Sequence, residues 1–158
     1  MLSRGILVSG KLCLTWQNYE QWMQELVPIL HRDHPQLKVV YGPPRGGLIP
    51  AVTLSHRLDL KHVQSIDQLR HLRGHSWNSW NEVLWVDEIV DSGKTLQGEL
   101  DELSTEMVTA SWIAREAVVP RFPTLHIHAV FPQSEWVVFP WEDRRRWESE
   151  RSEYVSRQ

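Results

Sequence analysis

Short apolar runs that suit buried strands alternate along this chain with patterns typical of amphipathic helices. The expected strands cover residues 11–15, 37–42, 62–66, 82–87, 107–114, 124–130 and 135–139, and the expected helices cover residues 17–32, 47–58 and 94–104. The polar residues 67–81 are expected to form a loop. Because strands that alternate with helices usually pair in parallel, the sequence predicts an α/β fold with a central, mostly parallel sheet flanked by helices.

Apolar spacing indicates which side of each helix should face the core. In the first expected helix, apolar residues recur at three- and four-residue spacing, as an amphipathic helix requires: Tyr19, Trp22, Met23, Leu26 and Leu30. In the second, the apolar positions include Leu48, Val52 and Leu54.

Histidines lie near the ends of two expected elements. His126 and His128 flank Ile127 in an expected strand, so both imidazoles should share one face of the sheet. No third metal ligand is evident beside them, so the pattern favours a solvated strand face over a metal site. His31 and His34, near the end of the first helix, are expected at the surface.

Composition limits the classes of protein to which the chain can belong. Its 158 residues, 41% of them hydrophobic and 23% charged, suit one compact globular domain over residues 1–158. A net charge of −3 gives no basis for nucleic-acid binding, and acids follow the cationic run at 144–146, which favours a solvated face. No apolar run approaches the ~18 residues of a membrane span. The single cysteine, Cys13, suits a buried thiol in a reducing, cytoplasmic location.

Three acidic residues follow an apolar strand pattern in the segment VLWVDEIVDSGKTL, residues 83–96. In parallel sheets, ligands bind beyond the carboxyl ends of the strands. This segment and the loop YGPPRGG, residues 41–47, are therefore candidate walls of one site. Adjacent side chains on a strand point to opposite faces, so Glu88, next to Asp87, is expected where the strand ends.

The Gly-Lys-Thr triplet in this segment does not form a nucleoside-triphosphate loop. That pattern requires a glycine five residues before Gly93, where the chain has Glu88. A different phosphate site fits, because Ser92, Gly93 and Thr95 lie where a helix begins and backbone N–H groups can converge on a phosphate monoester. The alternative is an ordinary helix start that Asp91 or Ser92 caps.

The acidic residues and the second loop extend this site. Carboxylates accept hydrogen bonds from sugar hydroxyls and attract a divalent cation, so an acidic pair beside an anion site suits a phosphorylated sugar. In the other loop, Gly46 and Gly47 expose backbone N–H groups and Arg45 supplies a cation with forked donors, which suits a pyrophosphate. The alternative for this loop is a plain Pro/Gly turn. Together the two loops suit a sugar with phosphate at one end and pyrophosphate at the other.

These segments carry a resemblance to a known family. VLWVDEIVDSGKTL resembles the phosphoribosyl-diphosphate signature of type I phosphoribosyltransferases, and PPRGGLIPAVTLSHRL is similar to their pyrophosphate loop and following helix. EWVVFPWE is similar to the C-terminal segment of bacterial and archaeal xanthine–guanine and hypoxanthine phosphoribosyltransferases. The resemblance covers about residues 14–142 and implies that the N- and C-terminal segments form a small hood.

The resemblance implies a purine phosphoribosyltransferase of purine salvage. A nitrogen of a 6-oxopurine (xanthine, guanine or hypoxanthine) would displace pyrophosphate from the anomeric carbon of phosphoribosyl diphosphate. The transition state should resemble an oxocarbenium ion, so positioning and charge stabilisation would carry most of the catalysis. Mg²⁺ is the implied cofactor, and the implied assembly is a homodimer or homotetramer.

The resemblance also assigns roles to residues. Asp87 and Glu88 would hold the ribose hydroxyls and the Mg²⁺ ion. The residues that would bind phosphoribosyl diphosphate are Arg45, Gly46, Asp87, Glu88, Asp91, Ser92, Gly93, Lys94 and Thr95. The peptide bond between Pro44 and Arg45 is expected to be cis, as is often found in this loop of the family.

Four residues are assigned to catalysis or to the nucleobase. Asp91 matches the aspartate near purine N7, where it can act as general acid or base. Arg115 falls where these enzymes place a lysine that reads the purine 6-oxo group. Trp136 matches the aromatic side chain that stacks on the purine. Val137 matches the residue whose backbone reads the 2-position.

The expected loop at 67–81 departs from the family pattern. In 6-oxopurine enzymes the corresponding mobile loop is longer and usually carries a Ser-Tyr pair, which this segment lacks. Arg70 or Arg73 could still reach the pyrophosphate, and Trp77 or Trp80 could close over the site.

Two other functions stay open. The altered loop and Arg115 allow a phosphoribosyltransferase for a different nucleobase. The chain could also be a regulator that senses phosphoribosyl diphosphate and has lost catalysis. Such regulators usually add a DNA-binding module, for which this chain has no room.

Overall fold

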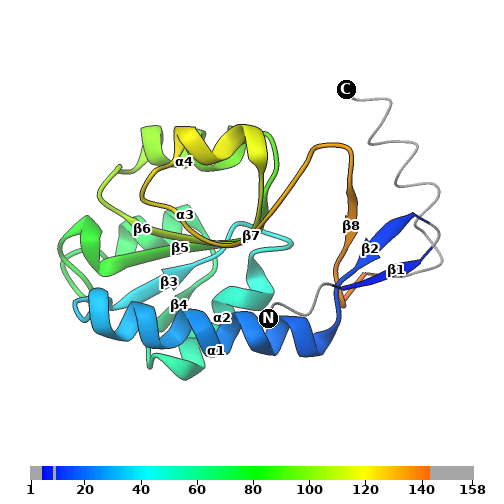
Figure 1. The fold of residues 1–158 in the computed structure, drawn as a ribbon. Coiled ribbons are helices and arrows are strands. Elements are labelled where there is room, and N and C mark those ends of the chain that lie inside the picture. Colours follow the sequence, from blue (N-terminus) through cyan, green and yellow to red (C-terminus); the bar gives the residue numbers. More distant parts are fainter. Residues whose placement is uncertain (1–4, 9, 143–158) are drawn as a thin grey trace. The chain divides into compact units, whose positions relative to one another are not determined.

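The computed structural model describes residues 5–8 and 10–142. The chain divides into two compact units. The first combines the residues up to Tyr19 with the segment that begins at Glu135, and the second runs from Glu20 to Ser134. Each unit has a sheet of its own (Figure 1). The single domain expected over residues 1–158 stays a prediction, and the cationic run at 144–146 lies outside the described residues.

The sheet of the first unit joins the two ends of the chain. Its three strands have the order β1-β2-β8. β1 (Ile6–Val8) pairs antiparallel with β2 (Lys11–Cys13), and β2 pairs parallel with β8 (Trp136–Val138). The N- and C-terminal segments therefore form a small structure together, as predicted. Cys13 is 3% exposed, which confirms the buried thiol.

The second unit contains a five-stranded sheet in the order β4-β3-β5-β6-β7, and every pair in it is parallel. The strands are β3 (Val39–Tyr41), β4 (Lys61–Val63), β5 (Val83–Val90), β6 (Val108–Arg115) and β7 (His126–Phe131). The helices are α1 (Trp16–Asp33), α2 (Leu48–Arg57), α3 (Ile66–Leu72) and α4 (Lys94–Glu102), with 3₁₀ helices η1 (Trp80–Glu82) and η2 (Glu116–Arg121). The predicted α/β fold with a mostly parallel sheet is confirmed.

Helices cover both faces of this sheet, with α1 and α2 on one side and α4 on the other (Figure 1). All five residues predicted for the buried side of α1 are buried. One of them, Trp22, stacks on Trp112 of β6 with ring centroids 5.5 Å apart. Another cluster of the core contains Tyr41 and Trp85 from the sheet together with Leu96 of α4. Stacked apolar layers therefore hold the sheet between its helices.

The apolar side of α2 differs from the prediction at one position. Leu54 and Ala51 are both fully buried, whereas Val52 is 43% exposed. Residues two apart on a helix point in nearly opposite directions, so Val52 cannot share a face with Leu54. The buried residues of α2 are Pro50, Ala51 and Leu54, and Leu48 is half-buried.

The prediction that residues 67–81 form a loop is wrong for residues 67–72, which belong to α3, and for the start of η1, whereas residues 73–79 lie in turns and irregular backbone. Ser65 caps this helix by accepting a hydrogen bond from the Gln68 N–H at 3.1 Å. Leu69 is fully buried, and Trp77 is 1% exposed and donates its indole N–H to the Leu69 carbonyl at 3.0 Å. A capped helix with an apolar residue on its inner face is stable here because Trp77 closes over it.

The prediction of a solvated face for His126 and His128 is wrong as well. Both histidines are half-buried beneath α1. His126 Nε2 lies 2.9 Å from His34 Nε2, and His128 Nδ1 lies 3.1 Å from Glu25 Oε2. His34 is therefore also not a plain surface residue, whereas His31 is exposed as expected. The prediction failed because the packing of α1 on β7 cannot be read from either segment alone.

Two features are absent from residues 5–8 and 10–142. None of the helices in this part of the chain is long and apolar enough to cross a membrane. Among the same residues, no group of three or more histidine, cysteine, aspartate or glutamate side chains could hold a metal ion.

Candidate active site

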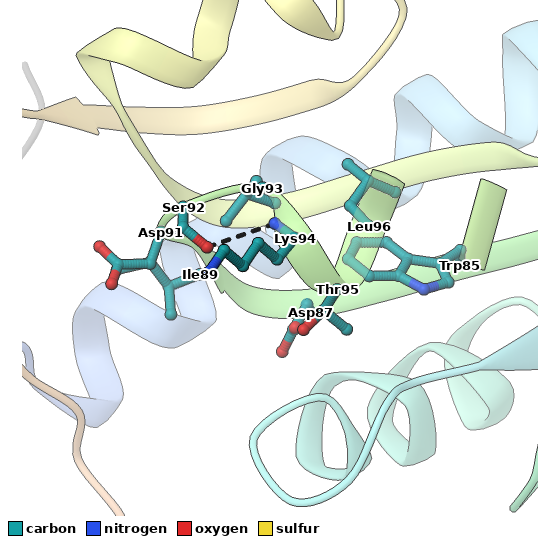
Figure 2. A pocket seen from close by; sticks show the side chains of 10 residues that line it. Trp85, Asp87, Ile89, Asp91, Ser92, Gly93, Lys94, Thr95 and Leu96 are labelled. Atoms are coloured by element: carbon teal, nitrogen blue, oxygen red, sulfur yellow. Dashed lines mark hydrogen bonds between the residues drawn. The ribbon is translucent and has the colours of Figure 1, made fainter. Parts of the chain in front are cut away.

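A pocket lies in the second unit where β5 gives way to α4 (Figure 2). The residues that line it are Trp85, Asp87, Ile89, Val90, Asp91, Ser92, Gly93, Lys94, Thr95 and Leu96. The predicted phosphate loop is therefore one wall of a pocket, with Asp87 and Asp91 beside it. The apolar members of the list anchor this wall to the core.

The turn before α4 has the geometry of an anion site. Gly93 is the N-cap residue with φ of +81°, a left-handed conformation that favours glycine, and no side chain caps the helix there. The Lys94 N–H donates to Ser92 Oγ at 3.3 Å (Figure 2). Ser92, Lys94 and Thr95 are exposed, so their polar groups face the solvent at the positive end of the helix. The N-cap residue is thus Gly93 and neither Asp91 nor Ser92, although Ser92 Oγ accepts from the first N–H of the helix.

Arg121 supports the same turn from outside the motif. Its Nη1 donates to the Ser92 carbonyl at 2.8 Å. A Cβ atom on Gly93 would lie 2.9 Å from the Phe122 ring and 3.0 Å from Arg121 Nη1. The sequence did not single out Arg121, because a residue at the end of η2 gives no sign that it reaches a loop so far away in the chain.

The acidic pair is divided between the two loops. β5 continues to Val90, which pairs with Ala114, so both acids lie inside the strand and the prediction that Glu88 ends it is wrong. Their side chains consequently point to opposite faces. Asp87 lines the pocket beside the phosphate loop. Glu88 packs against Gly46, where an added Cβ would lie 2.2 Å from Glu88 Cδ.

The loop with Gly46 begins at the end of β3. The peptide bond between Pro44 and Arg45 is cis, as predicted. Arg45 is exposed, and the Gly47 N–H donates to the Pro43 carbonyl at 3.0 Å in a tight turn before α2. The contact of Gly46 with Glu88 brings this loop to the second acid of the pair. The residues that line the pocket beside the phosphate loop do not include Arg45 or Gly46.

Burial sets the electrostatics of Asp87. Removal from water raises the pKa of its carboxyl to about 7, against the effect of the Glu88 N–H, which donates to Asp87 Oδ1 at 2.8 Å. The charge of Glu99 raises the pKa further. The Asp87 carboxyl is therefore only partly ionised at neutral pH in the free protein. A cation beside it would favour the ionised form.

Glu99 is a second residue that the sequence did not single out. It accepts hydrogen bonds from the Trp85 indole N–H at 2.5 Å and from the Tyr41 hydroxyl at 3.2 Å. Burial raises the pKa of the Glu99 carboxyl, and burial together with Glu99 raises that of Tyr41. Glu99 thus ties α4 to both β3 and β5, the strands that lead into the two loops.

Asp91 and Arg115 contact each other at the carboxyl ends of neighbouring strands. Arg115 Nε donates to Asp91 Oδ1 at 2.9 Å. Arg115 is 4% exposed, whereas one-third of the Asp91 side chain, 33%, is exposed. The structure therefore brings Asp91 to the pocket with Arg115 buried next to it.

Trp136 and Val137, assigned to the nucleobase by resemblance, belong to the first unit. Both lie on β8, where Trp136 pairs with Lys11 and Val137 with Leu12. Trp136 is half-buried and Val137 is 7% exposed.

The segment after β4 does not supply the residues suggested for closing the site. Trp77 is 1% exposed and belongs to the core. The Arg73 guanidinium lies 5.6 Å from the Trp77 ring centroid and 5.3 Å from that of Trp80. Arg70 pairs with Glu102 at 2.8 Å. These contacts hold the segment to the body of the second unit.

The donor set fits a magnesium ion that arrives with a phosphorylated substrate. Mg²⁺ is usually held by one or two carboxylates together with substrate phosphates, rather than by a cage of protein ligands. Asp87 lies beside the phosphate loop and Glu88 lies on the opposite face beside Gly46, so either could supply one carboxylate to an ion held mainly by substrate phosphates. No group of three or more ligands exists among the described residues. The ion would neutralise charge on the pyrophosphate when bound.

Comparison with known proteins finds similar enzymes, although no family model matches the chain. The chain is 29% identical over 127 residues to a xanthine-guanine phosphoribosyltransferase of Cereibacter sphaeroides, covering 70% of this chain and 72% of that protein. It is 26% identical over 142 residues to one of Gluconobacter oxydans, covering 82% and 83%. A solved purine phosphoribosyltransferase of Pyrococcus horikoshii superposes with a TM-score of 0.61 and 28% identity, covering 85% of this chain and 95% of that one. These relatives support the resemblance to the type I phosphoribosyltransferases, a family of enzymes.

Two further solved structures share the fold of this chain. A Helicobacter pylori xanthine-guanine-hypoxanthine phosphoribosyltransferase superposes with a TM-score of 0.61 at 22% identity, covering 91% of this chain and 96% of that one. A hypothetical protein of Neisseria gonorrhoeae, solved with bound ppGpp, superposes with a TM-score of 0.65 at 20% identity, covering 96% and 99%. At these identities the two structures support the fold alone.

Proposed function

We propose that the protein is a purine phosphoribosyltransferase that transfers the 5-phosphoribosyl group from phosphoribosyl diphosphate to a 6-oxopurine and releases pyrophosphate. The contact between Gly46 and Glu88 carries this proposal, because it joins the anion loop before α2 to the acidic pair on β5. The phosphate loop lies at the other acid, Asp87. One substrate with two phosphate ends and a hydroxyl-bearing sugar satisfies all three features.

Each loop would bind one phosphate-bearing end of phosphoribosyl diphosphate. The turn at Ser92, Gly93, Lys94 and Thr95 would hold the 5′-phosphate through backbone N–H groups, hydroxyls and the helix dipole. Arg45 and Gly46 would hold the pyrophosphate. Asp87 and Glu88 would accept hydrogen bonds from the ribose hydroxyls and bind Mg²⁺.

The remaining roles concern the purine. Asp91 would exchange a proton with purine N7 as general acid or base. Trp136 would stack on the purine ring, and the backbone of Val137 would read the 2-position. Arg115, at the end of β6, would belong to the same part of the site.

A nucleobase panel tests the proposal. Pyrophosphate release would be followed with phosphoribosyl diphosphate and Mg²⁺ in the presence of xanthine, guanine, hypoxanthine, adenine, uracil or orotate. We expect release that depends on a 6-oxopurine and on Mg²⁺. Release with adenine or a pyrimidine alone would favour the alternative of another nucleobase, and no release with any base would favour a regulator that only binds phosphoribosyl diphosphate.

One structure that shares this fold was solved with a bound guanine nucleotide. The protein of Neisseria gonorrhoeae holds ppGpp, a purine nucleotide with two pyrophosphate groups. A similar ligand would find both a purine and a pyrophosphate site in the proposed enzyme. The homodimer or homotetramer that the family implies stays a prediction, which light scattering would test.

A further inference from the structure

Arg115 is a buried cation in direct contact with the proposed general acid or base. Its Nε donates to Asp91 Oδ1 at 2.9 Å, and its Nη1 donates to the Pro132 carbonyl at 2.9 Å. A guanidinium stays charged throughout the physiological pH range. The contact with Asp91 is therefore a charge-assisted hydrogen bond, shielded from water on the side of the arginine.

The register of the sheet fixes this contact. Val90 of β5 pairs with Ala114 of β6, and Arg115 pairs with Phe131 of β7. Asp91 therefore leaves its strand beside Arg115 on one side, and Pro132 leaves its strand beside Arg115 on the other. Because both partners are at strand ends, the guanidinium is held across the carboxyl ends of three parallel strands.

Asp91 and Arg115 differ in their exposure to the pocket. The Asp91 side chain is 33% exposed, and Asp91 lines the pocket. The Arg115 side chain is 5% exposed, and Arg115 is absent from the described residues that line this pocket. The carboxylate thus lies between a fixed cation and the open space where a substrate would bind.

We propose that Arg115 is a positioning residue that acts through Asp91: it orients the Asp91 carboxylate toward the purine. This inference rests on the proposed function. It replaces the role in which a cation at this position reads the purine 6-oxo group. An arginine suits the positioning role because its planar fork binds two acceptors in fixed directions, which the single ammonium of a lysine cannot do.

A double-mutant cycle separates the two roles. Steady-state kinetics with hypoxanthine, phosphoribosyl diphosphate and Mg²⁺ would be measured for the wild type, Arg115→Gln, Asp91→Asn and the double variant. Asp91→Asn should lower kcat by ~10²–10⁴-fold, the usual contribution of a general acid or base. Arg115→Gln should lower kcat by about 10²-fold, the cost of a misplaced catalytic group, with little change in KM for either substrate. In the Asp91→Asn background, Arg115→Gln should cause no further loss.

Other outcomes would overturn the inference. If Arg115→Gln caused the same loss in both backgrounds and raised KM for hypoxanthine, Arg115 would contact the base itself. If the wild type released no pyrophosphate with any purine, the proposed function and this inference would both fail. If the wild type were active and Arg115→Gln lowered kcat equally with and without Asp91→Asn, the inference about Arg115 would fail and the proposed function would stand.

A second variant covers the case in which Arg115→Gln does not fold, since removal of one partner of a buried ion pair is strongly destabilising. Arg115→Lys keeps the charge and loses the fork. We expect it to lower kcat less than Arg115→Gln does, and again only when Asp91 is present. An Arg115→Lys variant with unchanged kcat and a lower KM for hypoxanthine would favour base reading. Arg32→Gln, at an arginine that is 71% exposed, is the control and should leave kcat unchanged.

Discussion

Gly46 allows the loop before α2 to approach Glu88, because it has no side chain. A side chain at position 46 would occupy the space of the Glu88 carboxylate, with its Cβ 2.2 Å from Cδ and from Oε1. Glu88 is a flexible side chain, so a larger residue would displace it rather than unfold the protein. Gly46 therefore leaves Glu88 in the position in which it is proposed to contact the substrate.

Gly46→Ala should weaken the binding of phosphoribosyl diphosphate, because the displaced Glu88 would lose its contacts with the substrate. A hydrogen bond to a charged group contributes ~1.5–3 kcal/mol, so the expected loss of affinity is about 10- to 100-fold, measured by calorimetry. Gly98→Ala is the matched control, since nothing lies within 4 Å of a Cβ there. It should leave binding unchanged and add about 0.5–1 kcal/mol of stability within α4. Equal affinities of both variants would contradict the assigned role of Glu88.

A second prediction for a single residue concerns Trp136. If its ring stacks on the purine, Trp136→Ala should weaken purine binding by ~1–3 kcal/mol and leave phosphoribosyl diphosphate binding nearly unchanged. Fluorescence titration with each ligand would measure both. Equal losses for the two substrates would indicate that Trp136 stabilises the first unit instead.

Among the elements, the segment from α3 to η1 differs most from what its sequence indicates. Polar residues dominate it, but Leu69 and Trp77 are buried in the core cluster. Trp77→Ala should therefore lower the free energy of unfolding by ~3–5 kcal/mol, measured by urea denaturation. Trp16→Ala, at a tryptophan that is 55% exposed, should cost far less. A stable Trp77→Ala protein with an altered KM would instead assign Trp77 to a closing loop.

The packing of α1 on β7 predicts a dependence of stability on pH. Burial lowers the pKa of both His126 and His128, and the neighbouring His34 lowers that of His126 further. Asp33 acts in the opposite direction on His126, as Glu25 does on His128. Below the ordinary value of about 6.5, the unfolded chain binds protons that the folded protein binds less readily. The contribution of these histidines to stability is thus present above that pH and declines below it.

His128→Gln tests this contribution. Between about pH 7 and pH 5, the free energy of unfolding of the variant should fall less steeply than that of the wild type, by up to ~1.4 kcal/mol per pH unit. Urea denaturation at several pH values would measure both slopes. His75→Gln, at an exposed histidine, should keep the slope of the wild type. Identical slopes for His128→Gln and the wild type would contradict the assignment.

For the whole molecule, the proposal predicts a coupling between ligand binding and stability. Phosphoribosyl diphosphate with Mg²⁺ at 100 times its Kd should stabilise the folded protein by ~2.7 kcal/mol, which raises Tm by about 5–10 °C for a chain of this size. Replacing Asp87 with Asn and Glu88 with Gln together should reduce both this shift and its dependence on Mg²⁺. Asp101→Asn, at an exposed acid on α4, is the control. A full, Mg²⁺-dependent shift in the double variant would remove the acidic pair from the site.

The sequence determined the features that depend on neighbours in the chain. The alternation of strands and helices, the buried side of α1 and the turn at Gly93 all follow from local spacing and from the conformational freedom of glycine. The motif on β5 and the loop before α2 were sufficient to indicate the family. These properties need only a few consecutive residues, so no knowledge of distant contacts was required.

Only the tertiary structure decided which distant residues complete these features. Parallel pairing of β5, β6 and β7 brings Arg115 to Asp91 and Pro132, and helix packing buries Trp77, His126 and His128. The side chains of the two adjacent acids also point to different loops, because β5 continues through both residues. Each of these contacts joins segments far apart in the chain. The physical reason is that register and packing depend on the whole sheet, and local patterns carry no record of which strand or helix lies alongside.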